Sequence, residues 1–243
     1  MLGSALVRHF APRCAVLEAP TREHFDALRD GVAALDVGRF DWMVNAAGLI
    51  NRRAGLGREA FLRGNSLFPR LLADACAAAG TRLIHVSTDC VLDGTRGDRL
   101  EDEPYDASDL YGTSKALGEP ANTLVLRSSI FGPEERNRYN LLCSVLAQTG
   151  AVRGFVNHRW NGVTTLEFAR AVERIMGDDL YSHGVRHVHG EGLTKHDLVA
   201  SIDTTSRLPL DIVPHEDEQA RHPGVSFPRK SLNRGTAKPP DIP

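Results

Sequence analysis

TRLIHVST (Thr81–Thr88) is a near-continuous apolar run that ends in two hydroxyl side chains. Such a run predicts a strand buried on both faces, because a strand with one exposed face would alternate apolar and polar residues. FDWMVNAAG (Phe40–Gly48) and NTLVLRSSIFG (Asn122–Gly132) predict two further strands, and CAVLEA (Cys14–Ala19) another. Several short buried strands spaced along the chain are the framework of a sheet.

Helical patterns separate these strands. REHFDALRDGVAAL (Arg22–Leu35) has apolar residues at helical spacing, and the segment Arg58–Gly80 predicts a helix with a break near Gly64 and Pro69. A third helix is expected to begin at Asp109, which could serve as its cap. Strand and helix in alternation predict an α/β fold, with a parallel sheet covered by helices on both faces.

The second half of the chain has a different character. Asn137–Gly150 and Thr164–Gly177 have the pattern of amphipathic helices, and the last thirty or so residues are expected to form a loose tail. We therefore expect the sheet domain to occupy residues 1–132. Residues 133–243 are expected to form mainly a small C-terminal lobe and tail, interleaved with the core.

The composition argues against some classes of function. The 243-residue chain has a formal net charge of −2, which argues against a nucleic-acid-binding surface, and no apolar run reaches the roughly 18 residues of a membrane span. The N-terminus does not resemble a secretory signal, so a reducing cytosol is the expected compartment. The four cysteines are widely spaced. We interpret the patch of His187, His189 and His196 as solvated loop histidines and not as a metal site.

Reactive side chains gather where three of the predicted elements should meet. In a parallel sheet, ligands bind beyond the carboxyl ends of the strands. Ala46–Gly48 follows one strand, Ser87 and Thr88 end the next, and Tyr111 and Lys115 lie four apart on one face of the following helix. The Tyr-x-x-x-Lys spacing alone is more often an ordinary helix with a solvated lysine. Its order with the other segments is the specific signal.

This set of groups suits carbonyl chemistry. A phenol has a pKa near 10, and a neighbouring lysine ammonium should lower it. A serine or threonine hydroxyl can bind a substrate carbonyl while Tyr111 supplies the proton. The hydride must come from a cofactor, because no side chain can donate one.

The order of the motifs resembles a known family. DWMVNAAG, GNSLFPRLLADACAAAG, LIHVSTDCVLDG, LYGTSKALGE and LVLRSSIFG are similar to the extended short-chain dehydrogenase/reductases, and among them to the dTDP-4-dehydrorhamnose reductase group, over Asp41–Gly132. The resemblance implies a Rossmann-like doubly wound parallel sheet with a small substrate lobe. It also implies NADP- or NAD-dependent reduction of a nucleotide-linked 4-keto-6-deoxy sugar for cell-surface polysaccharide, in the cytoplasm.

The same resemblance assigns roles to residues. The catalytic set is Thr88, Tyr111 and Lys115, with Tyr111 as proton donor. The residues expected to contact the cofactor are Gly3, Ala46, Ala47, Gly48, Asn65, Ser87, Tyr111, Lys115 and Ile130, the last within a segment, Arg127–Ile130, expected near the nicotinamide. The residues expected to contact the substrate are Thr88, Asp89, Trp160 and Asn161, although Trp160 could equally be a packed loop aromatic. No metal is expected.

Some positions leave alternatives open. Cys90 stands where the group usually has an aromatic residue, and Lys230 with Ser231 could approach the nucleotide. Arg22 could meet the 2′-phosphate of NADP, whereas Glu18 could bind the ribose diol of NAD.

The N-terminus departs from the family pattern. Gly3 resembles the last glycine of a phosphate-binding turn and Ser4–Phe10 the helix after it, but the first strand and two glycines of that pattern are absent. We favour a longer reading frame over a true truncation. An epimerase, or a non-catalytic reductase-like binding subunit, remains an alternative function, and a homodimer is possible.

Overall fold

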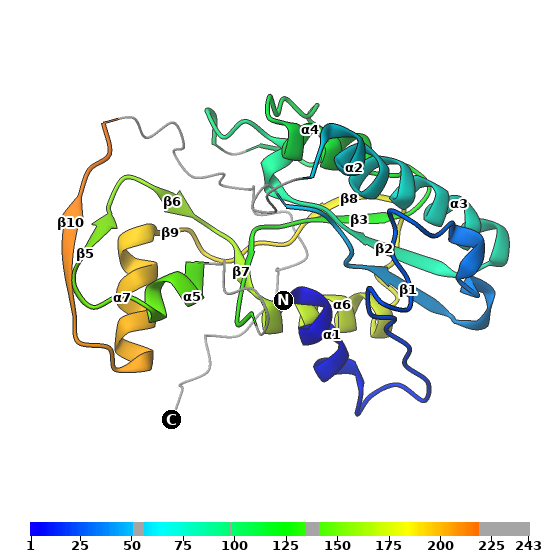
Figure 1. The fold of residues 1–243 in the computed structure, drawn as a ribbon, viewed down its shortest axis with the longest axis horizontal. Helices are drawn as coiled ribbons and strands as arrows, with labels where there is room; N and C mark the ends of the chain where they lie inside the picture. Colours follow the sequence, from blue (N-terminus) through cyan, green and yellow to red (C-terminus); the bar gives the residue numbers. More distant parts are fainter. Residues whose placement is uncertain (51–55, 98, 135–140, 219–243) are drawn as a thin grey trace.

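The sheet domain is built on a four-stranded parallel sheet (Figure 1). The computed structural model describes residues 1–50, 56–97, 99–134 and 141–218. The strands lie in the order β1 (Trp42–Asn45), β2 (Arg82–Val86), β3 (Leu124–Arg127) and β8 (Gly184–His187). This order does not reverse, and among the described strands β1 pairs with β2 alone. The predicted α/β fold with a parallel sheet is confirmed.

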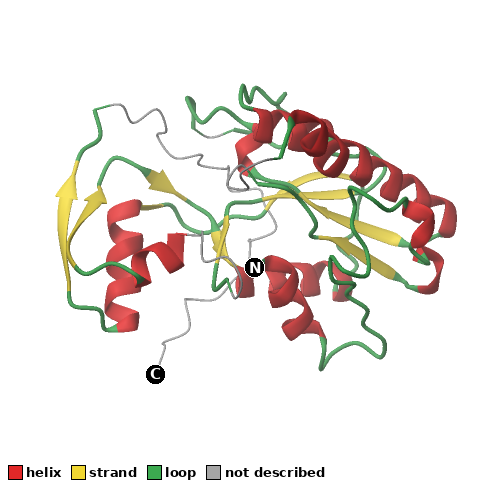
Figure 2. Ribbon diagram, in the orientation of Figure 1, coloured by secondary structure: helices red, strands yellow, loops and turns green. Residues whose placement is uncertain are grey.

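Helices cover both faces of this sheet (Figure 2). On one face lie α1 (Leu2–Phe10) and α6 (Thr165–Gly177), and on the other α2 (Arg58–Phe61), the π-helical segment Leu62–Leu67, α3 (Phe68–Ala79) and α4 (Leu110–Leu117). Alternate residues of β2 face these two layers. Ile84 packs with α1 and α6, whereas Leu83 packs against α3, and both are fully buried. This two-sided burial is what the apolar run of β2 predicts.

The helix predicted over Arg58–Gly80 forms without a break. Instead of stopping near Gly64, the backbone widens into the π-helical segment and then continues through Pro69. Proline has no N–H to donate, and a widened turn before it accommodates the lost helical hydrogen bond. The helix ends at Gly80, whose φ of 76° is the left-handed conformation that glycine adopts readily.

Two N-terminal predictions are wrong. Arg22–Leu35 is not a helix but a series of turns with a short 3₁₀ helix, η1 (Val32–Ala34). Its apolar side chains are drawn onto the cluster around α3, so tertiary packing outweighs the helical pattern. Cys14–Ala19 is not a strand, and Val16 is 57% exposed. A strand needs a neighbour to take up its backbone groups, and no described strand pairs with this segment.

A second lobe lies apart from the sheet, on the left in Figure 1. Its elements are α5 (Leu141–Leu146), β5 (Gly150–Phe155), β6 (Arg159–Trp160), β9 (Leu193–Thr194), α7 (Lys195–Ser206) and β10 (Leu210–His215). The lobe has its own apolar core, which includes Val145, Leu198, Val199 and Ile202. Of the helix predicted over Asn137–Gly150, residues 137–140 lie outside the described residues. The described part, α5, ends at Leu146, and Gly150 already belongs to β5.

The chain crosses between the two lobes more than once. β4 (Ile130–Phe131) follows β3 directly and pairs with β7 (Val163–Thr164), which leads back into α6. Thr164 caps α6 in a reciprocal arrangement with Glu167, the N-terminal signal expected of this sequence pattern. Because α6 and β8 belong to the sheet layer, the second half of the chain contributes to both lobes.

Candidate active site

The predicted reactive residues meet at the carboxyl end of β2. Thr88 follows this strand and caps the 3₁₀ helix η4 (Asp89–Val91), its Oγ1 accepting from the Cys90 amide at 3.2 Å. Tyr111 lies in the first turn of α4, which begins where expected because Asp109 caps it by accepting from the Gly112 amide at 2.9 Å. The Thr88 hydroxyl donates to Asp89 Oδ1 at 3.1 Å, and it lies near enough to the Tyr111 phenol to lower the pKa of that group. The structure therefore brings together the hydroxyl and phenol that the sequence selects.

Gly112 makes this approach possible. A Cβ atom at Gly112 would lie 2.2 Å from the carbonyl oxygen of Cys90, closer than any real contact. The opposite end of α4 is equally tight, since a Cβ at Gly118 would lie 1.8 Å from the carbonyl oxygen of Asn65. Glycines at both ends thus let α4 contact the main chain of its neighbours.

Lys115 is buried beneath the same strand end. Its Nζ donates to the carbonyl oxygen of Val86 at 2.8 Å. Burial lowers the pKa of Lys115 to about 8, and the nearby carboxylate of Glu119 opposes this shift. A Cβ at Gly48 would lie 3.8 Å from Nζ, so the turn after β1 also reaches this point. Ala47 and Gly48 are exposed, which leaves the surface beside Lys115 open.

The acidity of Tyr111 differs from the prediction. Burial raises the pKa of Tyr111, the nearby Cys90, Asp89 and Asp109 raise it further, and the nearby Thr88 hydroxyl opposes them. The expected lowering by Lys115 is therefore wrong for the chain as it is folded here. The physical reason is that burial disfavours the phenolate, while the Lys115 ammonium is directed to the Val86 carbonyl. Tyr111 consequently keeps its proton at neutral pH.

Asn65 connects the helices to the turn after β1. It lies in the π-helical segment and is fully buried. Its Oδ1 accepts from the Leu49 amide at 2.8 Å, and its Nδ2 donates to the Leu49 carbonyl at 3.0 Å and to Ser114 Oγ at 3.1 Å. Asn65 thereby holds the predicted cofactor-contacting turn against α4. π-Helical turns are often retained at functional sites for such side-chain placement.

One buried ionic group escaped the sequence prediction. Glu119, just beyond α4, accepts from Ser87 Oγ at 2.6 Å and forms a two-point ion pair with Arg127, at 2.9 Å to Nε and 2.7 Å to Nη2. Ser87, expected at the cofactor, is thus engaged by a carboxylate. The only sequence signal for Glu119 is its position four residues after Lys115.

A second polar pair lies on the same face of the sheet. Asn45 and His85 are neighbours in the β1–β2 register, and Asn45 Nδ2 lies 3.1 Å from His85 Nδ1. Burial, followed by the charge of Lys115, holds the pKa of His85 well below its usual value. His85 is therefore neutral, and nothing in the sequence distinguishes it from a histidine at a strand surface.

The other predicted residues lie away from this strand end. Trp160, Asn161 and Ile130 are at the junction of the lobes, where Trp160 Nε1 donates to Ser129 Oγ at 2.8 Å and the indole packs edge-on against Phe131. Asn161 is buried and its carbonyl accepts from the Gly190 amide at 2.8 Å. The structure thus places these residues together, but beside β4 and β7 and not on β2 or α4.

The N-terminal candidates are not assembled into a turn. Gly3 lies in the first turn of α1, exposed, with nothing within 4 Å of the position of a Cβ. Glu18 pairs with Arg39 at 2.7 Å and Arg22 with Asp26 at 2.8 Å, both at the surface. Lys230 and Ser231 lie outside the described residues.

The histidine patch also differs from its interpretation. His187 is on β8 and 1% exposed, so it is not a solvated loop residue. Burial, with the charges of Arg127 and His189, lowers the pKa of His187 to about 3. Within the described ranges, no group of three or more His, Cys, Asp or Glu side chains is arranged to hold a metal ion. In the same ranges, none of the helices combines the length and the apolarity required to traverse a bilayer.

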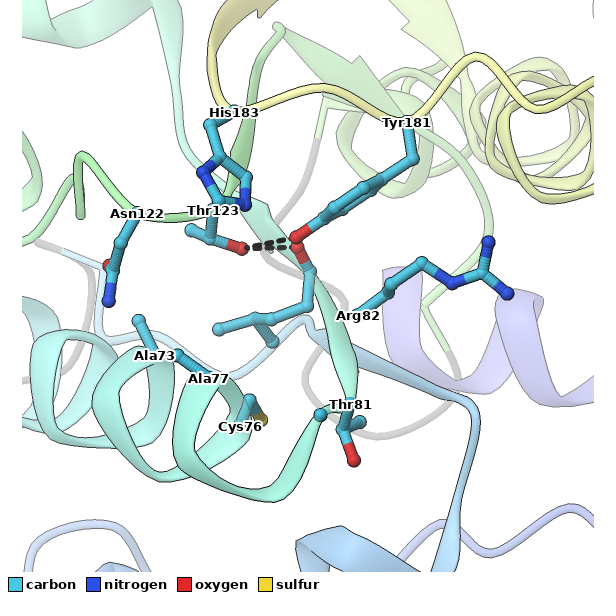
Figure 3. Close-up of a pocket in the computed structure, with 11 residues that line it drawn as sticks. Ala73, Cys76, Ala77, Thr81, Arg82, Asn122, Thr123, Tyr181 and His183 are labelled. Atoms are coloured by element: carbon cyan, nitrogen blue, oxygen red, sulfur yellow. Dashed lines mark hydrogen bonds between the residues drawn. The ribbon is translucent and has the colours of Figure 1, made fainter.

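A pocket of about 260 Å³ lies at the opposite end of the sheet (Figure 3). It is lined at the start of β2 by Thr81 and Arg82 and before β3 by Asn122 and Thr123. The Thr123 and Tyr181 hydroxyls lie 3.4 Å apart at its wall. None of the predicted site residues lines this pocket, so it is separate from the Thr88–Tyr111 pair.

Known proteins are similar to this chain in sequence and in fold. A dTDP-4-dehydrorhamnose reductase of Mycobacterium tuberculosis is 35% identical over 127 residues, 49% of this chain and 41% of that protein. One from Streptomyces griseus is 35% identical over 131 residues, 52% of this chain and 43% of that protein. The matched region therefore spans less than half the length of these relatives.

Solved structures are similar over a longer stretch. A dTDP-4-dehydrorhamnose reductase of Bacillus anthracis in complex with NADP has a TM-score of 0.77 at 17% identity, over 93% of this chain and 85% of the other. One from Clostridium acetobutylicum has a TM-score of 0.74 at 18% identity, over 94% and 86%. These similarities show a shared fold. The family model described as RmlD substrate binding domain matches residues 1–231. The chain therefore belongs to the RmlD substrate binding domain family.

Proposed function

We propose that this protein reduces the keto group of a nucleotide-linked 4-keto-6-deoxy sugar with NADPH or NADH. The observation that carries the proposal is the proximity of Thr88 to the Tyr111 phenol, with Lys115 on the next turn of α4. Membership of the family and the reductase relatives support the same reaction. The substrate class follows the relatives, which are dTDP-4-dehydrorhamnose reductases.

The nicotinamide end of such a cofactor fits the residues present. Small, exposed side chains at Ala47 and Gly48 leave the main chain accessible beside the Lys115 ammonium. Ala46, Ala47, Gly48 and Lys115 would hold this end, with Asn65 fixing the turn from behind. The bound cofactor would supply the hydride. NADP and NAD are both found in related structures, since the Bacillus anthracis reductase carries NADP and another neighbour, MoeE5, carries NAD.

The protein's own residues would handle the substrate oxygen. The Thr88 hydroxyl would donate to the keto oxygen and orient it. Tyr111, whose raised pKa keeps the phenol protonated at neutral pH, would give its proton to that oxygen as negative charge develops there. Lys115, held against the Val86 carbonyl, would place a positive charge behind the phenol and the cofactor ribose.

The remaining assignments complete this proposal. The second lobe would bind the sugar nucleotide, with Asp89 from the sheet domain and with Trp160 and Asn161 at the lobe junction. The domain division at residue 132, a cytoplasmic location and a homodimer are proposed with it. Lys230 and Ser231 stay predicted nucleotide contacts.

The proposal is tested by substrate-dependent oxidation of NADPH or NADH. The purified chain is mixed with each cofactor and a dTDP-linked 4-keto-6-deoxy sugar, and the loss of reduced cofactor is followed by absorbance. We expect turnover by the wild-type chain and a loss of roughly 10²–10⁴-fold in Tyr111→Phe. Tyr105→Phe is the matched control, because this phenol is 47% exposed in a loop outside the site.

Two results would reject the reductase. One is no oxidation with any keto-sugar nucleotide by a chain whose thermal unfolding shows it to be folded. The other is full activity in Tyr111→Phe. A folded chain that lacks turnover but retains a stoichiometric protein partner on purification would favour the binding-subunit alternative.

A further inference from the structure

The carboxylate of Glu119 joins three elements at the reactive end of the sheet. It accepts from Ser87, which directly follows β2, and from Arg127, the last residue of β3, while Glu119 itself follows α4 by two residues. The side chains of Arg127 and Glu119 are 4% and 9% exposed. Ser87 stands between Val86, whose carbonyl holds Lys115, and Thr88. Through its hydrogen bond with Ser87, Glu119 is therefore connected to both chain neighbours of that residue: Val86, which binds Lys115, and Thr88.

We propose that Glu119 is a positioning residue, which fixes Thr88 through Ser87 and acts on the Lys115 ammonium from the next turn of the chain. The inference rests on the proposed function for its catalytic meaning, but its physical content concerns only this chain. A buried ion pair contributes little net stability, since the loss of hydration offsets the attraction. A contribution to stability alone therefore does not explain the buried carboxylate of Glu119.

The Glu119 carboxylate is the neighbouring charge that stabilises the Lys115 ammonium. From β2, His85 faces the ammonium and is held neutral by burial. The π-helical segment contributes the uncharged Asn65. Burial is the larger influence on Lys115 and disfavours its charged form, whereas Glu119 favours it. Arg127 neutralises part of the Glu119 charge and holds the carboxylate in place.

The test measures the Lys115 titration directly. The chain has four lysines, so selective ¹³C labelling of lysine gives few side-chain signals, and Lys115→Arg identifies the one that matters. We expect a wild-type midpoint near pH 8. In Glu119→Gln the midpoint should fall by about half a pH unit or more, because the favourable charge is lost. Glu119→Asp should recover part of the shift. Glu59→Gln, which removes an exposed carboxylate, should leave the midpoint unchanged.

The variants are chosen so that an effect on folding can be distinguished from an effect on Lys115. Glu119→Gln leaves Arg127 buried without its partner, so the double variant Glu119→Gln/Arg127→Met provides a second sample in which both charges are removed. An unchanged Lys115 midpoint in Glu119→Gln would overturn the inference. Equal midpoints in the double variant and in Arg127→Met would overturn it too, because that pair differs only at Glu119. In an active chain, the pH profile of turnover should shift in the same direction as the midpoint. If the chain has no activity, the proposed function fails, and the midpoint still decides the role of Glu119.

Discussion

The Lys115 ammonium donates to the carbonyl oxygen of Val86 at 2.8 Å, which ties the middle of α4 to the last residue of β2. This contact joins helix and strand at the place where Thr88 and Tyr111 meet. The charge on Lys115 is held in a buried position, and its pKa is lowered as a result. Properties of the folded chain that can be measured without substrate follow from this arrangement.

The first is a pH dependence of stability. A lysine whose pKa falls from 10.5 to about 8 on folding favours the unfolded chain more strongly as the pH drops through that interval. Its contribution to the free energy of unfolding should therefore decrease by about 3 kcal/mol between pH 10.5 and pH 8. Urea unfolding of wild type and Lys115→Met across this range should give a difference with that slope. Parallel curves would contradict it.

The second concerns the Tyr111 phenol. Because burial raises its pKa, Tyr111 should not ionise at or below pH 10 in the chain alone. The difference between the tyrosinate absorbance titrations of wild type and Tyr111→Phe isolates this group. A phenol that ionises near neutral pH in that difference would show that Lys115 acts on it after all.

The third compares two glycines. Gly118→Ala should destabilise the fold by about 1–3 kcal/mol, because its Cβ collides with the main chain at Asn65. Gly3→Ala should instead stabilise α1 by about 0.5–1 kcal/mol, since nothing lies near the new methyl group and alanine is the better helix former. Thermal unfolding of both variants measures the contrast. Equal effects would mean that α4 is not held as closely as described.

The fourth concerns Asn65. Asn65→Leu removes three buried hydrogen bonds and leaves the Leu49 amide and carbonyl unsatisfied. We expect a loss of about 2–5 kcal/mol in the free energy of unfolding. Asn122→Ala is the control, because this exposed side chain donates to Asp74 at the surface and its loss should cost less than about 0.5 kcal/mol. A small effect of Asn65→Leu would argue that the π-helical segment forms without this side chain.

Local signals in the sequence were sufficient to predict β2 and α4, the two elements next to Thr88, Tyr111 and Lys115. The cap at Asp109 and the spacing of Tyr111 and Lys115 lie within one short segment, and the apolar run of β2 is contiguous. Both therefore predict structure before any tertiary contact is known. The Glu119 group could not be predicted in this way, because its partners Ser87 and Arg127 become neighbours only when β2 and β3 pair.

The wrong predictions also depend on contacts that form only in the folded chain. The pattern of Arg22–Leu35 is helical, yet Phe25, Val32 and Leu35 pack onto the cluster around α3 without forming a helix there. The direction of the Tyr111 pKa shift was predicted wrongly, because burial dominates that pKa and burial is a property of the whole fold. Sequence spacing identified which groups meet, but not how strongly the surroundings shift their acidity.

The second lobe has an apolar core separate from the clusters that support the sheet. Substitutions around Val145 and Ile202 can therefore accumulate without repacking the residues behind Tyr111 and Lys115. Ligand preference and bond-making geometry would then evolve as separate traits within one gene.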